Sequence, residues 1–244
     1  MTLTTQLAIG ALFAVLVASA AWRLRLLSGS GAVAAFWLGW VVFGLGGWAW
    51  TIILMAFFIS SSLFSRLFKR KKISAERMAA KGSRRDAAQV LANGGVAGVF
   101  VLLHAFLPHQ DLFWLGYCAA LAAANADTWA TELGVLNRRK PVKLFTGQPV
   151  EAGTSGAVSL AGTLAALAGA GFMGLFSWFL HPAGAEAGAM VLGVITFAGL
   201  AGSLVDSALG AKVQAIYFCP SCARETEQYP RHSCGTETLF LRGR

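Results

Sequence analysis

Long apolar segments separated by short polar ones dominate this chain. Residues 1–22 carry no charge, and residues 32–68 form a longer apolar block with Gly44, Gly46 and Gly47 near its middle. A membrane-spanning helix needs about 20 mostly apolar residues, so this block predicts two helices joined by a turn at its glycines. Four further apolar segments lie at about residues 86–107, 112–134, 153–180 and 187–212. The pattern therefore predicts seven transmembrane helices.

The first segment is predicted to remain in the protein as a helix. Ala18, Ser19 and Ala20 resemble a signal-peptidase site. A signal peptide, however, carries its positive charges before the apolar stretch. Here Arg23 and Arg25 follow it.

The composition supports a membrane protein. The 244 residues are 56% hydrophobic and 13% charged, whereas a soluble domain carries about 25% charged residues. A net charge of +9 would suggest nucleic acid as a partner of a soluble protein. In a membrane protein, basic residues in loops set the topology instead. We therefore expect the lipid bilayer as a partner and no nucleic acid.

The 20 Lys and Arg residues all fall in segments that the seven-helix scheme assigns to one side. Nine of them lie between Arg66 and Arg85, and four more lie between Arg138 and Lys143. Because positive loops stay in the cytoplasm, the N-terminus is predicted outside and the C-terminus inside. The predicted fold is an all-α, polytopic bundle of about seven transmembrane helices in the cell membrane. It occupies residues 1–217, and a short cytoplasmic tail occupies residues 218–244.

Polar residues interrupt the apolar segments near the predicted cytoplasmic ends of the helices. Charged groups within the membrane are costly, so they indicate function by default. Three are carboxylates, Asp127, Glu132 and Asp206, which we predict to be catalytic. Further candidates for binding substrate or nucleotide at the same depth are Arg84, Arg85, Asp86, Gln89, Asn93, Asn125, Thr131, Glu151, Thr154, Ser155, Ser207 and Lys212.

A structural alternative is that Asp127 and Glu132 pair with Arg or Lys and hold the bundle together. These two residues are five positions apart and diverge by about 140° around a regular helix. They cannot both bind one ion without help from another helix, and Asp206 is the natural third contributor. For Ser60, Ser61 and Ser62, at the inner end of an earlier helix, hydrogen bonding back to the helix carbonyls is the simpler interpretation.

The candidate groups suit phosphate chemistry. Mg²⁺ is bound through one or two carboxylates and leaves positions for substrate phosphates, so Asp127, Glu132 and Asp206 are the predicted magnesium ligands. Arg and Lys nearby suit a polyphosphate, and backbone N–H groups of residues 153–156, predicted at a helix start, suit a phosphate oxygen. The sequence thus predicts phosphoryl transfer to a lipid at the cytoplasmic leaflet.

The tail contains a second candidate site. Cys219, Cys222, His232 and Cys234 provide four ligands of the kinds that a tetrahedral structural zinc ion takes. The predicted cytoplasmic location is reducing, which argues against a disulfide. A zinc knuckle is the predicted structure, and a tail without metal is the alternative. Cys118 is interpreted as a buried thiol in a helix.

Five motifs in order resemble one integral membrane family, which includes phytyl-phosphate kinase and the vertebrate transmembrane protein 19. The motifs are residues 84–95, 125–134, 153–159, 202–211 and 219–235, and the resemblance covers about residues 31–243. Family members continue past the tail with an acidic and Asn-containing motif and another hydrophobic helix. The sequence ends at Arg244 without them.

The resemblance implies phosphorylation of an isoprenoid monophosphate, such as phytyl or geranylgeranyl phosphate, to its diphosphate. Phytol kinase and dolichol kinase use CTP, so CTP is the expected donor and ATP the alternative. Carried over by motif, the three carboxylates are directed at the metal. Asn93 and Asn125 become polar site residues, and Arg84, Arg85 and Lys212 become phosphate contacts.

Three alternatives remain open at this point. A CTP-dependent isoprenoid alcohol kinase would want a carboxylate as base. A lipid-phosphate cytidylyltransferase is disfavoured because the motif of CDP-alcohol phosphotransferases is absent. An ion-coupled secondary transporter also uses intramembrane carboxylates, although usually near the bilayer midplane. Assembly into a homo-oligomer is also possible in each case.

Overall fold

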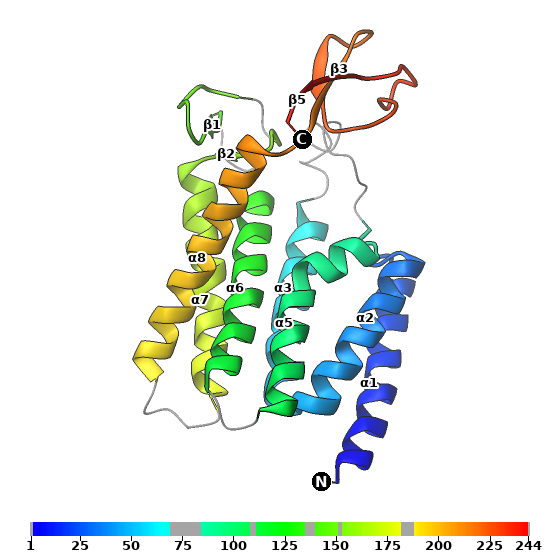
Figure 1. The fold of residues 1–244 in the computed structure, drawn as a ribbon, viewed down its shortest axis with the longest axis vertical. Coiled ribbons are helices and arrows are strands. Elements are labelled where there is room, and N and C mark those ends of the chain that lie inside the picture. The colour runs from blue at the N-terminus through cyan, green and yellow to red at the C-terminus, as the bar shows by residue number, and fades with distance from the viewer. Residues whose placement is uncertain are drawn as a thin grey trace.

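The structure, a computed structural model, describes residues 2–68, 84–107, 111–134, 140–150, 153–181 and 188–243. A bundle of helices fills most of it (Figure 1). In chain order they are α1 (Leu3–Arg23), α2 (Gly29–Val41) with its π-helical continuation η1 (Val42–Gly46), α3 (Trp48–Leu67), α5 (Ala87–Phe106), α6 (Asp111–Gly134), α7 (Leu160–Phe179) and α8 (Gly188–Lys212).

Successive helices run in alternate directions (Figure 1). The predicted hairpin within residues 32–68 is confirmed. Its turn is the π-helix η1, which ends at Gly47 with φ +76°, a left-handed conformation that glycine adopts readily. As a result the C-terminal ends of α1, α3, α6 and α8 and the N-terminal ends of α2, α5 and α7 lie at the same end of the bundle. The C-terminal tail lies at that end too.

The chain is confirmed as a multi-span membrane protein. Within the described residues, α1, α2 with η1, α3, α5, α7 and residues 190–212 of α8 make six helices long and apolar enough to cross a membrane. The central helix α6 has 24 residues, but Asn125, Asp127 and Glu132 lower its hydropathy. Seven spans, and the orientation with the N-terminus outside, therefore stay predictions.

Large apolar side chains cover the outside of the bundle. Leu160, Phe179 and Phe197 each expose more than 70% of their surface. A soluble monomer rarely exposes a continuous apolar surface of this kind. Lipid chains are the natural solvent for this surface.

Side-chain caps set where several helices begin. The Ser28 hydroxyl accepts a hydrogen bond from Gly31 N at the start of α2, and the Ser159 hydroxyl accepts one from Gly162 N at the start of α7. Such bonds satisfy N–H groups that lack a partner in the first helical turn. The prediction that a helix begins near residue 153 was therefore wrong. Residues 153–156 instead form a turn, a short strand follows, and the helix starts only after the Ser159 cap.

Helices α6, α7 and α8 pack through glycine and alanine. A Cβ atom at Gly202 of α8 would lie 2.6 Å from the Ala123 Cβ of α6, and one at Gly199 would lie 2.9 Å from the Cβ atoms of Ala122 and Ala170. Small residues let helix backbones approach closely in a membrane, where van der Waals packing drives association. These three helices therefore form a tight unit.

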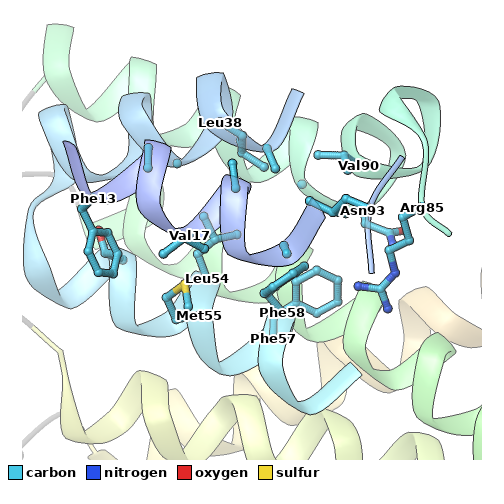
Figure 2. Close-up of a pocket in the computed structure, with 18 residues that line it drawn as sticks. Phe13, Val17, Leu38, Leu54, Met55, Phe57, Phe58, Arg85, Val90 and Asn93 are labelled. Atoms are coloured by element: carbon cyan, nitrogen blue, oxygen red, sulfur yellow. The ribbon is translucent and has the colours of Figure 1, made fainter. Parts of the chain in front are cut away.

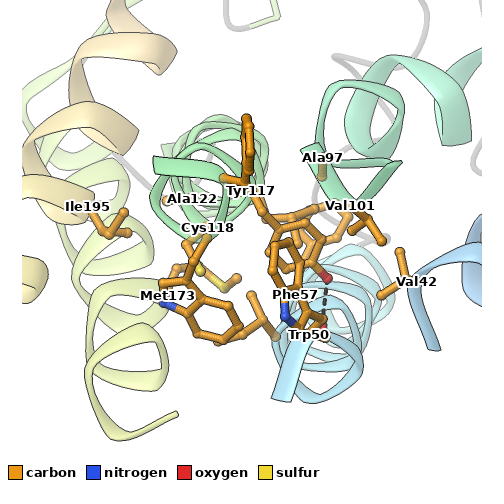
Figure 3. Close-up of a cluster of buried hydrophobic side chains, with 14 of the residues drawn as sticks. Val42, Trp50, Phe57, Ala97, Val101, Tyr117, Cys118, Ala122, Met173 and Ile195 are labelled. Carbon is orange, nitrogen blue, oxygen red and sulfur yellow. Dashed lines mark hydrogen bonds between the residues drawn. The ribbon is translucent and has the colours of Figure 1, made fainter. Parts of the chain in front are cut away.

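A larger core fills the space between α3, α5, α6 and α7 (Figure 3). Trp50, Phe57, Tyr117 and Met173 are buried there. The Tyr117 hydroxyl donates a hydrogen bond to the Trp50 carbonyl over 2.5 Å. The bond satisfies a phenol that would be costly to bury alone. Cys118 is also fully buried in this core, as the sequence predicted.

The cytoplasmic-tail prediction omitted β structure. Strand β3 (Ile216–Cys219) pairs with β4 (Arg224–Thr226) and with β5 (Leu239–Arg242) in an antiparallel sheet. A second pair, β1 (Val142–Lys143) and β2 (Ala157–Val158), joins the segments between α6 and α7. The fold is thus mostly helical rather than all-α, since backbone groups in the loops are paired by short strands.

Candidate functional site

The described candidate residues come from four helices and lie toward one end of the bundle, the end that carries the tail (Figure 1). Arg84 to Asn93 belong to the start of α5, and Asn125 to Glu132 belong to the last part of α6. Thr154 and Ser155 precede α7, and Asp206 to Lys212 end α8. Glu151 lies outside the described residues.

Glu132 forms a buried polar cluster with α3 and the segment before α5. Its side chain is only 5% exposed, and the Ser65 hydroxyl donates a hydrogen bond to Glu132 Oε1 over 2.7 Å. Arg85 interacts electrostatically with the Glu132 carboxylate and donates from Nη1 to the Ser61 hydroxyl over 3.1 Å. Burial lowers the pKa of the Arg85 guanidinium, and the Glu132 charge partly offsets this. The structural alternative, a carboxylate held near an arginine, therefore describes Glu132 well.

The backbone fixes Arg85 in place. Arg85 N donates to Leu26 O over 3.1 Å, and Ser28 N donates to Arg85 O over 3.0 Å. A Cβ atom at Gly31 would lie 2.1 Å from Arg85 O, so only glycine fits beside it. Arg84, by contrast, is exposed. One arginine of the pair is thus anchored between helices, and the other faces outward.

Asp86 and Gln89 form a capping box at the start of α5. Gln89 N donates to Asp86 Oδ1 over 2.9 Å, and Asp86 N donates to Gln89 Oε1 over 3.1 Å. This reciprocal pair satisfies backbone donors at the helix start. Their predicted substrate contacts stay predictions, whereas their capping role is visible.

Asn125 joins three helices. It is fully buried, its Nδ2 donates to Gly169 O of α7 over 2.9 Å, and its Oδ1 accepts from the Ser60 hydroxyl of α3 over 3.0 Å. Ser60 and Ser61 also donate to Phe57 O within α3, over 3.3 and 2.7 Å. The predicted bonds back to helix carbonyls are present for Ser60 and Ser61, and these two serines also contact Asn125 and Arg85.

Asp127 and Asp206 lie at the same level of two packed helices. Ala123 of α6 touches Gly202 of α8, and the two aspartates follow these residues by four positions each. Because α6 and α8 run in the same direction (Figure 1), both aspartates lie one turn beyond that contact, toward the tail. Asp206 is exposed and Asp127 is half-buried. Their side chains occupy a different environment from Glu132.

Thr131 and Ser207 accompany these aspartates. The Thr131 hydroxyl donates to the Asp127 carbonyl over 2.8 Å, which is the common way for a helical threonine to satisfy its side chain. Ser207 is half-buried next to Asp206. Roles for either residue in binding substrate stay predictions.

The glycine turn before α7 packs on the end of α8. A Cβ atom at Gly156, where φ is +72°, would lie 2.4 Å from Ala211, and one at Gly210 would lie 2.6 Å from Ser155 Oγ. This contact brings together two motifs that are far apart in the sequence. Beside it, the Lys212 ammonium lies 4.3 Å from the centre of the Phe145 ring, in the range of a cation–π interaction.

The three carboxylates do not form a ready metal cluster. In the part of the chain that the structure describes, Cys219, Cys222, His232 and Cys234 are the one group of three or more possible ligands close enough to share an ion. Glu132 faces Ser65 of α3, whereas Asp206 is exposed on α8. Among the described residues the three carboxylates therefore do not gather around one point, and their roles in binding a metal stay predictions.

A cavity lies between α1, α2, α3 and α5 (Figure 2). Its lining is apolar except for Thr51, Arg85 and Asn93. Phe13 marks one end, and Arg85 and Asn93 mark the other (Figure 2). Sequence reasoning found Arg85 and Asn93 but missed the cavity itself. Its other walls read as ordinary apolar spans, so the sequence held no signal for it.

Sequence reasoning also missed Ser65. This residue stands four positions after Ser61 on α3, on the same helix face. Ser61 binds Arg85, and Ser65 binds Glu132. The spacing of the two serines was the available signal.

The Cys/His group of the tail is assembled around the sheet. The ligand atoms of Cys219, Cys222, His232 and Cys234 all lie within 4.8 Å of one another. The Sγ atoms of Cys219 and Cys234 are 3.5 Å apart, and His232 Nδ1 is 3.2 Å from Cys234 Sγ. These separations fit ligands about 2.0–2.3 Å from a tetrahedral zinc ion. The group can hold a metal ion such as zinc.

Hydrogen bonds shift the pKa values of two thiols in this group. Bonding with the side chain and backbone of Thr236, and then with His232, lowers the pKa of the Cys234 thiol to about 5. The pKa of Cys222 is raised to about 11, chiefly by its hydrogen bond with Cys234. Metals bind the thiolate form, which Cys234 adopts at neutral pH.

Comparison with known proteins matches this arrangement of motifs to a family. The family model described as integral membrane protein DUF92 matches residues 12–243. The chain belongs to this family. The resemblance drawn from the five motifs is thereby confirmed, and in this DUF92 protein those motifs lie toward one end of the bundle.

Relatives of this DUF92 protein occur in archaea and plants. An uncharacterised membrane protein of Methanocaldococcus jannaschii is 36% identical over 187 residues, which are 77% of this chain and 74% of that protein. Protein PGR of Arabidopsis thaliana is 34% identical over 224 residues, 84% of this chain and 77% of its own. The chloroplastic protein VTE6 of the same plant is 27% identical over 195 residues, 77% of this chain and 56% of its own. No solved structure matches the chain.

Proposed function

We propose that this protein is a membrane kinase that converts an isoprenoid monophosphate, such as phytyl or geranylgeranyl phosphate, to its diphosphate with CTP or ATP. The family membership, together with the resemblance of the five motifs to a family that includes phytyl-phosphate kinase, supports a prenyl-phosphate substrate. The observation that carries the proposal is that the aspartates of α6 and α8 lie at one level, toward the end of the bundle where the glycine turn before α7 packs on α8 (Figure 1).

The reaction joins two phosphates. An oxygen of the acceptor monophosphate attacks the γ-phosphorus of the nucleotide, the bond to the β-phosphate oxygen breaks, and the nucleoside diphosphate leaves. The acceptor is already anionic at neutral pH, so the protein needs to position it and neutralise charge rather than remove a proton. In this proposal Arg85 binds the acceptor phosphate, and Arg84 and Lys212 bind the phosphates of the nucleotide.

Asp127 and Asp206 are the proposed magnesium ligands. Two carboxylates suit Mg²⁺, which takes its remaining ligands from water and substrate phosphates. When bound, the ion neutralises charge on the transferring phosphoryl group. Glu132 has a positioning role in this scheme, since its carboxylate and Ser61 hold the Arg85 guanidinium from two helices.

The first test is turnover by the purified full chain in lipid nanodiscs. With Mg²⁺, nucleoside triphosphate and geranylgeranyl phosphate, mass spectrometry should detect the diphosphate. Asp127→Asn should lower its rate at least about 100-fold, the size expected for loss of a charge-stabilising group. Asp111→Asn is the matched control, because Asp111 is exposed at the opposite end of α6. Equal rates for both variants would refute the assignment of Asp127.

We also propose a structural zinc ion at the Cys/His group. Four protein ligands close the coordination sphere, which is typical of structural rather than catalytic zinc. Purified protein should contain about one zinc per chain, measured by plasma mass spectrometry, and Cys222→Ser should lose it. Cys118→Ala should keep the zinc, because Cys118 is buried in α6. Wild-type protein prepared with zinc present and found free of metal would contradict the proposal.

A further inference from the structure

We propose that the cavity between α1, α2, α3 and α5 holds the hydrocarbon chain of the acceptor lipid, with the lipid phosphate at Arg85. We propose further that the Phe13 end of the cavity limits the length of chain that is accepted. This inference rests on the proposed function, because it names where that acceptor binds.

The charge in the cavity lies at one end. Arg85 and Asn93 lie there, whereas Val17, Leu54 and Met55 line an apolar interior (Figure 2). In a bilayer, an apolar chain gains little by leaving lipid for protein, since both surroundings are apolar. Recognition must therefore come from shape and from the charged end. A molecule with one anionic head and one apolar chain fits both features.

The anion site is built rather than incidental. Arg85 lies against the ring of Phe57, with its guanidinium carbon 5.9 Å from the ring centre, and donates to Ser61. Its backbone is held by Leu26 and Ser28. A guanidinium has five N–H donors, and its planar fork matches phosphate oxygens. The side chain can thus bind a lipid phosphate without losing its anchor.

A second, more open groove borders the Phe13 end of the cavity. It runs along α3 toward Trp129, Phe172 and Phe176 and is almost entirely apolar. Both spaces are lined by Phe13, Thr51 and Met55. These three side chains therefore form the boundary between the cavity and the groove.

The lining residues of α1 mark successive levels along the length of the cavity. On α1, lining residues run from Phe13 through Val17 to Ala21, which spans about 12 Å at 1.5 Å per residue. Ala21 stands toward the Arg85 end, and Phe13 marks the far end. Because α1 packs on α2 and η1, the cavity wall has a fixed length. A bulky side chain at an intermediate level should shorten the accepted chain and leave the phosphate site open.

The direct test is photo-crosslinking without nucleotide. Full-length protein in nanodiscs is incubated with geranylgeranyl phosphate that carries a diazirine at the far end of its chain, and labelled peptides are mapped. Label is expected on residues at the far end of the cavity from Arg85, such as Phe13 of α1 and Met55 of α3 (Figure 2). Unlabelled geranylgeranyl phosphate should displace it better than the uncharged alcohol. Label confined to outward-facing residues would overturn the proposal.

A pair of variants tests the length limit. Val17→Trp places bulk inside the cavity, whereas Val15→Trp, two residues away, faces outward and is the matched control. For Val17→Trp, crosslinking by the geranylgeranyl probe should fall roughly tenfold or more, as expected when a site must accommodate extra bulk. The shorter geranyl phosphate should bind as before. Equal loss for both variants, or for both chain lengths, would contradict the length limit.

Two measures keep the outcomes separate. Size-exclusion profiles show whether Val17→Trp folds, and Val17→Phe, a smaller change, replaces it if that variant aggregates. Crosslinking needs no turnover, so cavity labelling in a protein without kinase activity would refute the proposed reaction but support this binding site. Turnover together with label only outside the cavity would support the proposed reaction and refute this binding site.

Discussion

The two sides of the bundle differ in how closely their helices approach. On one side α6, α7 and α8 touch through glycine and alanine, so that Gly202 leaves no room for a Cβ beside Ala123. On the other side α1, α2, α3 and α5 surround a cavity with a mostly apolar lining. Helices apolar enough to span a membrane occur on both sides, so hydrophobicity alone does not explain the difference.

In the proposed kinase, the closely packed side and the cavity side would have different tasks. Close packing fixes the relative level of Asp127 and Asp206, as a site for phosphoryl transfer requires. Loose packing leaves space that a lipid chain can occupy. The two sides meet at α6, where Glu132 interacts with Arg85 and Asn125 joins α3 to α7. A head group at the end of the cavity would therefore lie next to the face of α6 that carries Glu132.

The largest expected difference in stability comes from the same truncation made on each side. Leu121 is fully buried in the core of α6, whereas Leu54 of α3 lines the cavity. Leu121→Ala should cost about 2–5 kcal/mol, because a tightly packed site leaves a void. Leu54→Ala should cost less than the low end of that range, since it only enlarges existing space. Unfolding titrations in mixed micelles measure both, and equal costs would contradict the comparison.

Adding bulk should also be costly where α6 and α8 pack closely. Gly202→Leu must push α8 away from α6 and should cost about 1–3 kcal/mol, the usual penalty for overpacking. Turnover should fall as well, because the change alters the position of Asp206 relative to Asp127. Gly193→Leu on the same helix is the control, since no atom lies within 4 Å of a Cβ there. Thermal unfolding that is equally affected in both variants would rule out close packing as the cause.

The smallest effect is expected at the junction of the two sides. Ser60→Ala removes the hydrogen bond from α3 to Asn125 and should cost about 0.5–1.5 kcal/mol, as for a neutral hydrogen bond. Ser19→Ala, at an exposed position of α1, should change nothing measurable. A double-mutant cycle with Asn125→Ala isolates the pair. Zero coupling energy in that cycle would mean that the bond does not join the sides.

The sequence predicted the features that depend on local composition. Apolar length gave the helices, and the glycines at residues 44–47 gave the turn of the hairpin. Residue type and spacing gave the Cys/His group. The start of α7 was misplaced because the polar residues before it suit a helix start as well as a turn. Only the Ser159 cap and the packing of Gly156 on Ala211 decide between them.

Tertiary geometry accounts for what could not be predicted. Asp127, Glu132 and Asp206 look equivalent as intramembrane carboxylates, yet Glu132 turns toward Ser65 and Asp206 is exposed on α8. The cavity depends on how α1 and α2 lie against α3 and α5, which no single helix encodes. The role of Ser65 could not be predicted either, because it depends on Glu132, a partner 67 positions away.

The most direct test of the proposed kinase follows the phosphorus atom. Purified protein in nanodiscs receives geranylgeranyl phosphate, Mg²⁺ and CTP or ATP labelled with ³²P at either the γ or the α position, and the extracted lipid is counted. We predict γ-label in the lipid diphosphate, no α-label, and loss of the γ-label in Asp206→Asn. Label from the α position would show nucleotidyl transfer instead, and lipid without label from any nucleotide would contradict the kinase.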